Sequence, residues 1–154
     1  MIITKVFKWS MSHRLENHNR LCKNVHGHNY KLIVSIKKVD RNQKIIDKAK
    51  KTNEGMVCDF TDLKVIVSKV IVEPFDHAFV FNENDSKSRV IAQFLAKKIG
   101  QKTLALPFRM TAENMVQWIV EEINNYFLTT KINLKCVKAE LYETDDSSAI
   151  YECE

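Results

Sequence analysis

The chain has 154 residues, a mass of 18.0 kDa and 45% hydrophobic residues, which predicts one domain, residues 1–154, with a core of its own. Its formal net charge of +5 would suit a nucleic-acid partner, but the lysines are spread along the sequence rather than clustered with aromatics, so we expect none. The most apolar stretch, residues 65–72, is interrupted by Ser68 and Lys69, so we expect no segment that enters or crosses a membrane.

The first two elements are predicted to be paired strands. Odd positions of residues 3–13 form a mostly apolar row that ends in His13, and even positions of residues 26–36 form a second row that starts with His26 and His28. If the two strands pair as a hairpin, the end of the first meets the start of the second. His13 then lies beside the other two imidazoles, next to the loop that connects the strands.

In three later segments the apolar residues recur at helical spacing, so that those of each segment would form one stripe on a helix. We expect helices over residues 59–74, 86–99 and 111–127. Asp59 and Thr111 are suitable N-caps, Gly100 is a suitable C-cap, and Pro74 is expected to end the first helix. The apolar stripe expected on the second helix consists of Val90, Ile91, Phe94, Leu95 and Ile99.

Three further strands are expected over residues 103–108, 134–143 and 149–153, the last two joined by a turn at residues 144–148. A polar, lysine-rich connection is expected around residues 40–54. Strands therefore come as hairpins with intervening helices rather than as regular β-α-β units. The expected fold class is α+β with a four-stranded antiparallel sheet.

The segment Cys22-Lys23-Asn24-Val25-His26-Gly27-His28 carries the strongest functional signal. Two histidines two residues apart on a strand point to the same side, so His26 and His28 can bind one metal ion, and His13 supplies a third imidazole. Three imidazoles with an open fourth position are typical of catalytic zinc. The alternative is a pair of polar residues at a strand start. Gly27 points to the opposite face, where it allows a close backbone approach or an unusual torsion.

The four cysteines, at positions 22, 58, 136 and 153, form no C-x-x-C pair and no short-spaced framework. This argues against a structural zinc knuckle and against a secreted disulfide scaffold, so we expect reduced thiols in a cytoplasmic protein. Cys22 differs from the others because it lies four residues before the histidine pair. A thiol beside a cation loses its proton readily, so Cys22 is a candidate base. The other three are expected to be small core residues.

The order of the motifs along the chain resembles the family of 6-pyruvoyltetrahydropterin synthase and 6-carboxytetrahydropterin synthase. The matching segments run from near one end to the other and are Ser12-His13-Arg14-Leu15, Cys22-x3-His26-Gly27-His28-Asn29-Tyr30, Met56-Val57-Cys58-Asp59-Phe60-x-Asp62-Leu63-Lys64, Asp76-His77, Thr111-Ala112-Glu113-Asn114 and Tyr142-Glu143-Thr144. The resemblance implies a tunnelling fold (T-fold), in which helices cover one face of an antiparallel sheet. It also implies that trimers close their sheets into a barrel and that two trimers stack into a homo-hexamer.

The resemblance further implies roles for the site residues. The expected zinc ligands are His13, His26 and His28. Cys22 is expected to work with an Asp-His pair, here Asp76 and His77, in which the carboxylate orients the imidazole and the imidazole exchanges the proton. Glu143 is expected to accept two parallel hydrogen bonds from the N–H and amino group of a pterin. Glu113 is expected to be a further pocket residue, with a carboxylate favoured by the helix dipole as the alternative.

The implied activity is that of a zinc-dependent lyase acting on 7,8-dihydroneopterin triphosphate. The three-residue gap between Cys22 and His26 is similar to that of the carboxy-forming enzyme of the queuosine pathway, whereas tetrahydrobiopterin-forming members have a longer gap. We therefore expect 6-carboxy-5,6,7,8-tetrahydropterin, acetaldehyde and triphosphate as products. One alternative is the 6-pyruvoyl product from the same substrate. Another is a non-catalytic oligomer that binds zinc or a pterin, which would need neither a thiol nor an Asp-His pair.

Two features of the sequence bear on substrate preference. The helix expected at residues 86–99 is longer than the connection found in compact members of the family, and it can reshape the pocket or a subunit contact. Arg14, Arg20 and Lys23 lie close enough to the histidines in sequence to contact phosphate, and a role as exposed surface charges is the alternative.

Overall fold

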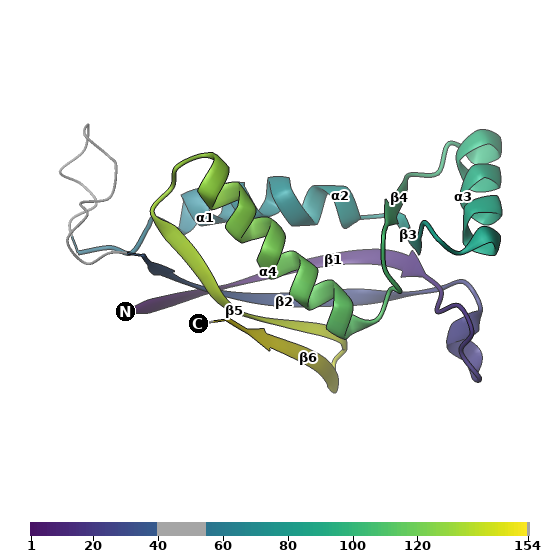
Figure 1. Cartoon of the computed structure of the whole chain (residues 1–154), viewed down its shortest axis with the longest axis horizontal. Coiled ribbons are helices and arrows are strands. Elements are labelled where there is room, and N and C mark those ends of the chain that lie inside the picture. The colour runs from purple at the N-terminus through teal and green to yellow at the C-terminus, as the bar shows by residue number, and fades with distance from the viewer. Residues whose placement is uncertain (40–54, 154) are drawn as a thin grey trace.

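Figure 1 shows the computed structural model, in which residues 1–39 and 55–153 are described. The strands are β1 (Ile2–His13), β2 (His26–Lys38), β3 (Phe79–Asn82), β4 (Thr103–Leu106), β5 (Leu134–Thr144) and β6 (Ser147–Glu152). The helices are α1 (Phe60–Val67), α2 (Glu73–Phe75), α3 (Ser86–Ile99) and α4 (Ala112–Thr129), with a 3₁₀ turn at Leu21–Lys23 and a π-helical turn at Ser68–Val72. The connection expected around residues 40–54 lies outside the described residues. Among those described, no helix has the length and apolar character needed to cross a bilayer.

The predicted α+β class is confirmed, and the sheet is larger than expected. Its six strands have the order β4-β3-β1-β2-β5-β6. The four long strands pair antiparallel, as predicted, while β3 and β4 extend the sheet at the β1 edge and run parallel to β1. β4 falls within the strand expected at residues 103–108. The sequence pattern does not predict β3, because four residues are too few to show an alternation.

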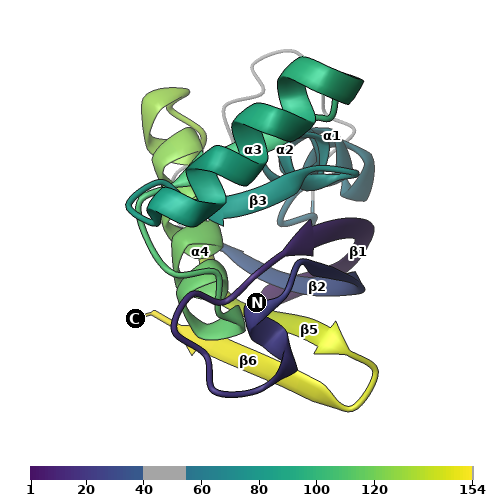
Figure 2. The same ribbon diagram turned by 90° about the vertical axis from the view of Figure 1, so that its right-hand side faces the viewer.

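Side chains on one face of the sheet form the main core together with α1, α2 and α4. In β1, the buried Phe7, Trp9 and Met11 alternate with more exposed residues, and α4 contributes a buried stripe from Met115 to Phe127. The sheet curls around α4, which packs on β5 and β6 (Figures 1 and 2). This arrangement leaves the end of β1 and the start of β2 at one end of the molecule, close to the N-terminus of α4.

The first predicted helix is continuous from Phe60 to Phe75 but contains the π-helical turn. Asp59 caps it as predicted and accepts a hydrogen bond of 2.6 Å from the Thr61 N–H. Its fully buried residues recur every four positions and are Leu63, Val67, Ile71 and Phe75. The wider π turn keeps this spacing on one face. Pro74 does not end the helix, because it lies in the first turn of α2, where its missing N–H is tolerated.

The helix α3 has the predicted bounds and the predicted cap at Gly100, whose φ is 66°. Its buried side is narrower than expected, since three residues of the predicted stripe are exposed, namely Val90, Phe94 and Ile99. Through Ala92 together with Ile91 and Leu95, the two other residues of the predicted stripe, the helix packs onto Phe79 and Phe81 of β3. Because Val80, between these two, belongs to the main core, α3 lies on the opposite face of the sheet from the other helices.

Candidate functional site

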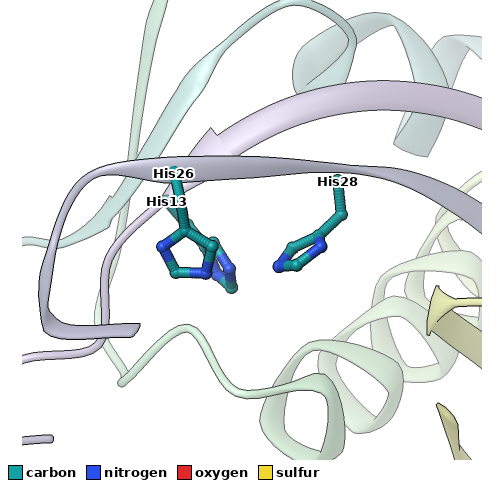
Figure 3. Close-up of side chains that lie close together, drawn as sticks. All are labelled: His13, His26 and His28. Atoms are coloured by element: carbon teal, nitrogen blue, oxygen red, sulfur yellow. The ribbon is translucent and has the colours of Figure 1, made fainter. Parts of the chain in front are cut away.

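The three predicted metal ligands lie together at the end of the β1–β2 hairpin. The strand register places His13 opposite His26, two residues before His28, and all three imidazoles point to the same side (Figure 3). Their ring centroids are 4.6, 4.9 and 5.4 Å apart. One nitrogen of each ring lies within 4.8 Å of the other two. A single ion at about 2 Å from each nitrogen can bridge this spacing after small side-chain rotations.

Main-chain carbonyls orient two of the imidazoles. The Nδ1 atom of His13 lies 3.0 Å from the Met110 carbonyl oxygen, and that of His26 lies 2.8 Å from the Asn24 carbonyl oxygen. A carbonyl oxygen only accepts, so both Nδ1 atoms donate and both Nε2 atoms are left as ligands. Burial, followed by the neighbouring His26, lowers the pKa of His13 to about 4, and burial also lowers the pKa of His28. Neutral imidazoles bind metal ions, so the donor set fits zinc.

Gly27 lets the two strands approach closely between the ligands. A Cβ atom on Gly27 would lie 2.8 Å from the Met11 carbonyl oxygen, closer than real Cβ contacts. The φ angle of Gly27 is outside the left-handed region, which only Gly55 and Gly100 adopt among the described glycines. Of the two roles that the sequence leaves open for this glycine, the structure therefore supports the close approach.

Glu143 extends to the edge of the candidate metal centre, which is the group of His13, His26 and His28. Its Oε1 atom lies 3.4 Å from His13 Nε2 and 3.8 Å from His28 Nε2. The hydroxyl of Tyr30 donates a hydrogen bond of 3.3 Å to the same oxygen. Burial, and then the Glu143 charge, raise the pKa of Tyr30, so the hydroxyl keeps its proton. The Glu143 carboxylate is thus fixed by a donor on one side.

A pocket of about 360 Å³ beside the metal centre brings together Cys22, Glu113 and Glu143. Cys22 comes from the 3₁₀ turn in the loop between β1 and β2, as predicted, and the loop is folded back by a 2.8 Å hydrogen bond from the Leu15 N–H to the Cys22 carbonyl. Glu113 comes from the first turn of α4. The pocket therefore combines a thiol and two carboxylates next to three imidazoles.

Asp76 and His77 form the predicted pair just past the end of α2. Asp76 Oδ1 lies 2.9 Å from His77 Nδ1, and the same oxygen accepts a 3.2 Å hydrogen bond from the Ser10 N–H. Burial raises the pKa of the Asp76 carboxyl, but the hydrogen bonds from Ser10 and His77 outweigh this and lower it overall. The His77 backbone is left-handed, with φ of 60°, and its side chain is 82% exposed. The imidazole is oriented by the carboxylate and open to a partner.

The two described cavities that Cys22 lines do not include Asp76 or His77. His77 lines a separate cavity of about 420 Å³, together with residues that include Ser10, Ser12, Gly27 and Asn29. These four alternate along β1 and β2 with the metal ligands and with Met11, so they face the other side of the sheet. Within one chain, the sheet therefore lies between His77 and Cys22.

Four groups near the site were not identified from the sequence. The Tyr30 hydroxyl could have been, because Tyr30 continues the row of even positions that carries His26 and His28. The Met110 carbonyl and the side chains of His18 and Arg109, which line the Cys22 pocket, come from loops. Loop residues show no periodicity, so only the tertiary structure brings them to the site.

Comparisons with known proteins agree with the motifs. The family model described as 6-pyruvoyl tetrahydropterin synthase matches residues 2–154. The 6-carboxy-5,6,7,8-tetrahydropterin synthase of Haemophilus influenzae is 37% identical over 150 residues, which are 97% of each chain. The protein of the same name from Rickettsia felis is 31% identical over 149 residues, which are 92% of each chain.

Two solved structures have the same fold. An uncharacterized protein from Wolinella succinogenes matches with a TM-score of 0.75 at 21% identity, over 100% of this chain and 98% of the other. The 6-pyruvoyl tetrahydropterin synthase of Caenorhabditis elegans matches with a TM-score of 0.61 at 22% identity, over 100% and 96%. With a family model matched over almost its whole length and relatives above 30% identity, the chain belongs to the 6-pyruvoyl tetrahydropterin synthase family.

Proposed function

We propose that the chain is a zinc-dependent 6-carboxy-5,6,7,8-tetrahydropterin synthase that acts on 7,8-dihydroneopterin triphosphate. The observation that carries this proposal is the pocket lined by Cys22, Glu113 and Glu143, in which the Glu143 carboxylate reaches the histidine group, 3.4 Å from His13 and 3.8 Å from His28. The names of the curated relatives support the choice of product. The products are 6-carboxytetrahydropterin, acetaldehyde and triphosphate, and one water is taken up because the ester oxygen leaves with the triphosphate. As part of the proposal, the enzyme is cytoplasmic and supplies the queuosine precursor.

Each residue of the pocket has a separate task in this proposal. Zinc bound by the histidines supplies the Lewis acidity that makes a hydroxyl or C–H bond of the substrate side chain easier to deprotonate. The Cys22 thiolate accepts the proton. Glu143 holds the pterin ring by accepting hydrogen bonds from its N–H and amino group, and Tyr30 orients the carboxylate that does so. Glu113 contributes a second carboxylate to the ring end of the pocket.

Asp76 and His77 exchange the second proton in this proposal, and they must come from another copy of the chain. The pair lies across the sheet from the Cys22 of its own chain, so it can reach a thiol only on a neighbouring subunit. In the described part of the chain β4 and β6 are the edge strands of the sheet, and such neighbours can pair with them. We propose a homo-hexamer of two stacked trimers, in which the sheets close into a barrel.

The alternative product is 6-pyruvoyltetrahydropterin, which the description of the matching family model supports. Side chains just after α3 contact the backbone of the Asp-His pair: Gln101 Nε2 donates to the His77 carbonyl at 2.7 Å, and Lys102 Nζ donates to the Asp76 carbonyl at 3.0 Å. The segment that follows α3 thus helps to position the Asp76–His77 pair. A different position of this pair would change which bond of the substrate is broken. A non-catalytic zinc- or pterin-binding oligomer is the second alternative.

Mass spectrometry of the product formed by zinc-loaded protein from 7,8-dihydroneopterin triphosphate tests the proposal. We expect 6-carboxytetrahydropterin with an equal amount of acetaldehyde. A 6-pyruvoyl product without acetaldehyde would replace the proposed reaction by the first alternative. Binding of the substrate without turnover would leave only the non-catalytic alternative.

A further inference from the structure

A second, larger cavity adjoins the Cys22 pocket. It measures about 980 Å³ and is formed by the loop of residues 17–23 together with Arg109. The basic side chains that line it are Arg20, Lys23 and Arg109, with His18 between them. None of its lining residues, all of which the structure describes, is acidic. The cavity therefore offers positive charge without a carboxylate to neutralise it.

The cationic groups of this cavity are free to bind a ligand. The Nε atom of Arg109 is buried and has no hydrogen-bond partner among residues 1–39 and 55–153. Arg20 and Lys23 are exposed, and neither side chain forms an ion pair within the described residues. Arg14, the third candidate from the sequence, is excluded because its guanidinium contacts Asp85 at 2.5 Å and Ser88 at 3.3 Å. A buried guanidinium N–H without an acceptor is costly unless a ligand satisfies it.

The loop presents further donors to the same space. The Arg20 N–H donates a 3.1 Å hydrogen bond to His18 Nδ1, so the Nε2 atom of the neutral ring carries the proton and is a donor. The left-handed Asn17, with φ of 58°, turns the chain before this residue. Arg14 Nε holds the Lys23 carbonyl at 3.0 Å, which fixes the far end of the loop. The donors are thus held in place before a ligand arrives.

The two cavities form one elongated site with opposite charge at its ends. His18, Cys22 and Arg109 line both of them. The smaller cavity carries Glu113 and Glu143, which suit a ring that donates hydrogen bonds, and the larger cavity carries the cations. A ligand with donors at one end and a polyanion at the other fits this polarity, and its central atoms would lie beside the Cys22 thiol.

We propose that the larger cavity is a polyphosphate subsite, in which Arg20, Lys23 and Arg109 bind the triphosphate of the substrate. The cavity by itself specifies a short polyphosphate, and its assignment to a dihydropterin triphosphate rests on the proposed function. The subsite places the substrate side chain, between ring and triphosphate, at the junction where Cys22 lies. Guanidinium and ammonium groups are the usual partners of phosphate oxygens.

Calorimetric titration of inorganic triphosphate into the zinc-loaded full-length protein tests the subsite. Wild type is compared with Arg20→Gln, Lys23→Gln and the double variant, and Arg89→Gln is the matched control, because Arg89 is an exposed arginine of α3 that lines neither cavity. We expect triphosphate binding to weaken by roughly tenfold for each cation removed and to weaken with added salt. The control should bind like wild type. Since Arg20 and Lys23 are exposed, their variants should fold normally.

Two further measurements separate the subsite from the proposed function. Neopterin, which has no phosphate, should bind the double variant as it binds wild type, and KM for the dihydropterin triphosphate should rise while kcat stays within about twofold. Normal turnover with equal triphosphate affinity in wild type and double variant would overturn the subsite and leave the function standing. Loss of triphosphate binding in the double variant, in a protein that never converts the dihydropterin, would leave the subsite standing and overturn the function. Failure of wild type to bind triphosphate would overturn the subsite.

Discussion

Three histidines of the chain converge at one point while the other two do not, although His18 is closer to the His26–His28 pair in sequence than His13 is. His18 lies in an adjoining cavity, and His77 lies on the other face of the sheet. The difference arises from the strand alternation, which places His13, His26 and His28 on one face. Binding of a metal ion should therefore depend on these three residues alone.

Replacing one ligand tests this directly. His26→Ala and His28→Ala should each lose most of the metal from a protein that otherwise holds about one zinc per chain, because two imidazoles bind zinc weakly. His18→Ala is the matched control and should keep its zinc. The measurement is metal analysis of the purified proteins. Full zinc in His26→Ala would exclude the three-histidine centre.

The buried His13 makes the metal-free protein sensitive to acid. Its pKa is about 4 in the folded chain and 6.5 ordinarily, so between these values the unfolded chain binds more protons. The contribution of the neutral His13 to the free energy of unfolding should therefore be fully present above pH 6.5. It should be lost as the pH falls toward 4, which lowers the free energy of unfolding by up to about 3 kcal/mol. Urea unfolding of chelated protein at pH 7 and pH 5 measures this. His13→Ala, which lacks the imidazole, should show a shallower pH dependence, and an equal slope in both proteins would contradict the assignment.

The position of Glu143 predicts a separation of pterin binding from metal binding. Glu143→Gln keeps the shape but replaces an acceptor by a donor that faces the pterin donors, so pterin affinity should fall roughly ten- to a hundredfold, on the scale of a charge-assisted hydrogen bond. The zinc content should stay unchanged because the three imidazoles remain. Titration of neopterin into wild type, Glu143→Gln and Glu113→Gln measures the effect. If only Glu113→Gln weakened binding, the ring anchor would be Glu113.

At the scale of elements, the β1–β2 hairpin holds the metal centre because its strands approach closely at Gly27. Gly27→Ala should push the Met11 carbonyl away and separate the strands between two ligands, at a cost of about 1–3 kcal/mol in unfolding free energy. Zinc affinity should fall with it. Gly100→Ala is the control, since it strains the left-handed residue that caps the end of α3 and should destabilise the protein while zinc binding stays normal. Equal zinc affinity in wild type and Gly27→Ala would show that the hairpin tolerates the side chain.

The sequence predicts the elements whose signals are local. The bounds of α3, the caps at Asp59 and Thr111, and the pairing of His13 with His26 follow from periodicity, capping residues and alternation. Two features depend on the rest of the fold. The strand β3 is short and buried on both faces, so it has no alternation, and the exposed side of α3 follows from its contact with the short strands β3 and β4.

The residues of the candidate site also divide into those that the sequence predicts and those that only the fold brings together. The histidines, Cys22 and the two glutamates lie in motifs that the sequence displays, and the structure brings them to one end of the hairpin. The cations of the larger cavity do not form a motif, since Arg109 lies 86 residues after Lys23 in the sequence. Only the folding of α4 against the sheet brings Arg109 next to the loop that carries Cys22.

At the scale of the whole molecule, one chain contains both halves of the proposed active site without joining them. The three histidines and Cys22 lie on the face covered by α4, and His77, the imidazole of the Asp76–His77 pair, lines a cavity on the other face. An imidazole that is 82% exposed and oriented by a carboxylate is suited to contact another protein surface. If the enzyme is a symmetric oligomer, each thiol can receive its Asp-His pair from a neighbour.

Mixing two inactive variants tests this arrangement. Cys22→Ala and His77→Ala should each keep their zinc and each lose most turnover, because one lacks the thiol and the other lacks the imidazole. The two variants are coexpressed with different tags, and the mixed oligomers are purified. A site is intact when the His77→Ala subunit supplies Cys22 and the Cys22→Ala subunit supplies His77. For random mixing of equal amounts, about one quarter of the sites should regain wild-type activity. The control is a mixture of separately assembled variants, which should stay inactive. Mixed oligomers without activity would mean that the thiol and the Asp-His pair act within one chain. Normal turnover by either variant alone would mean that the group it lacks has no part in the reaction.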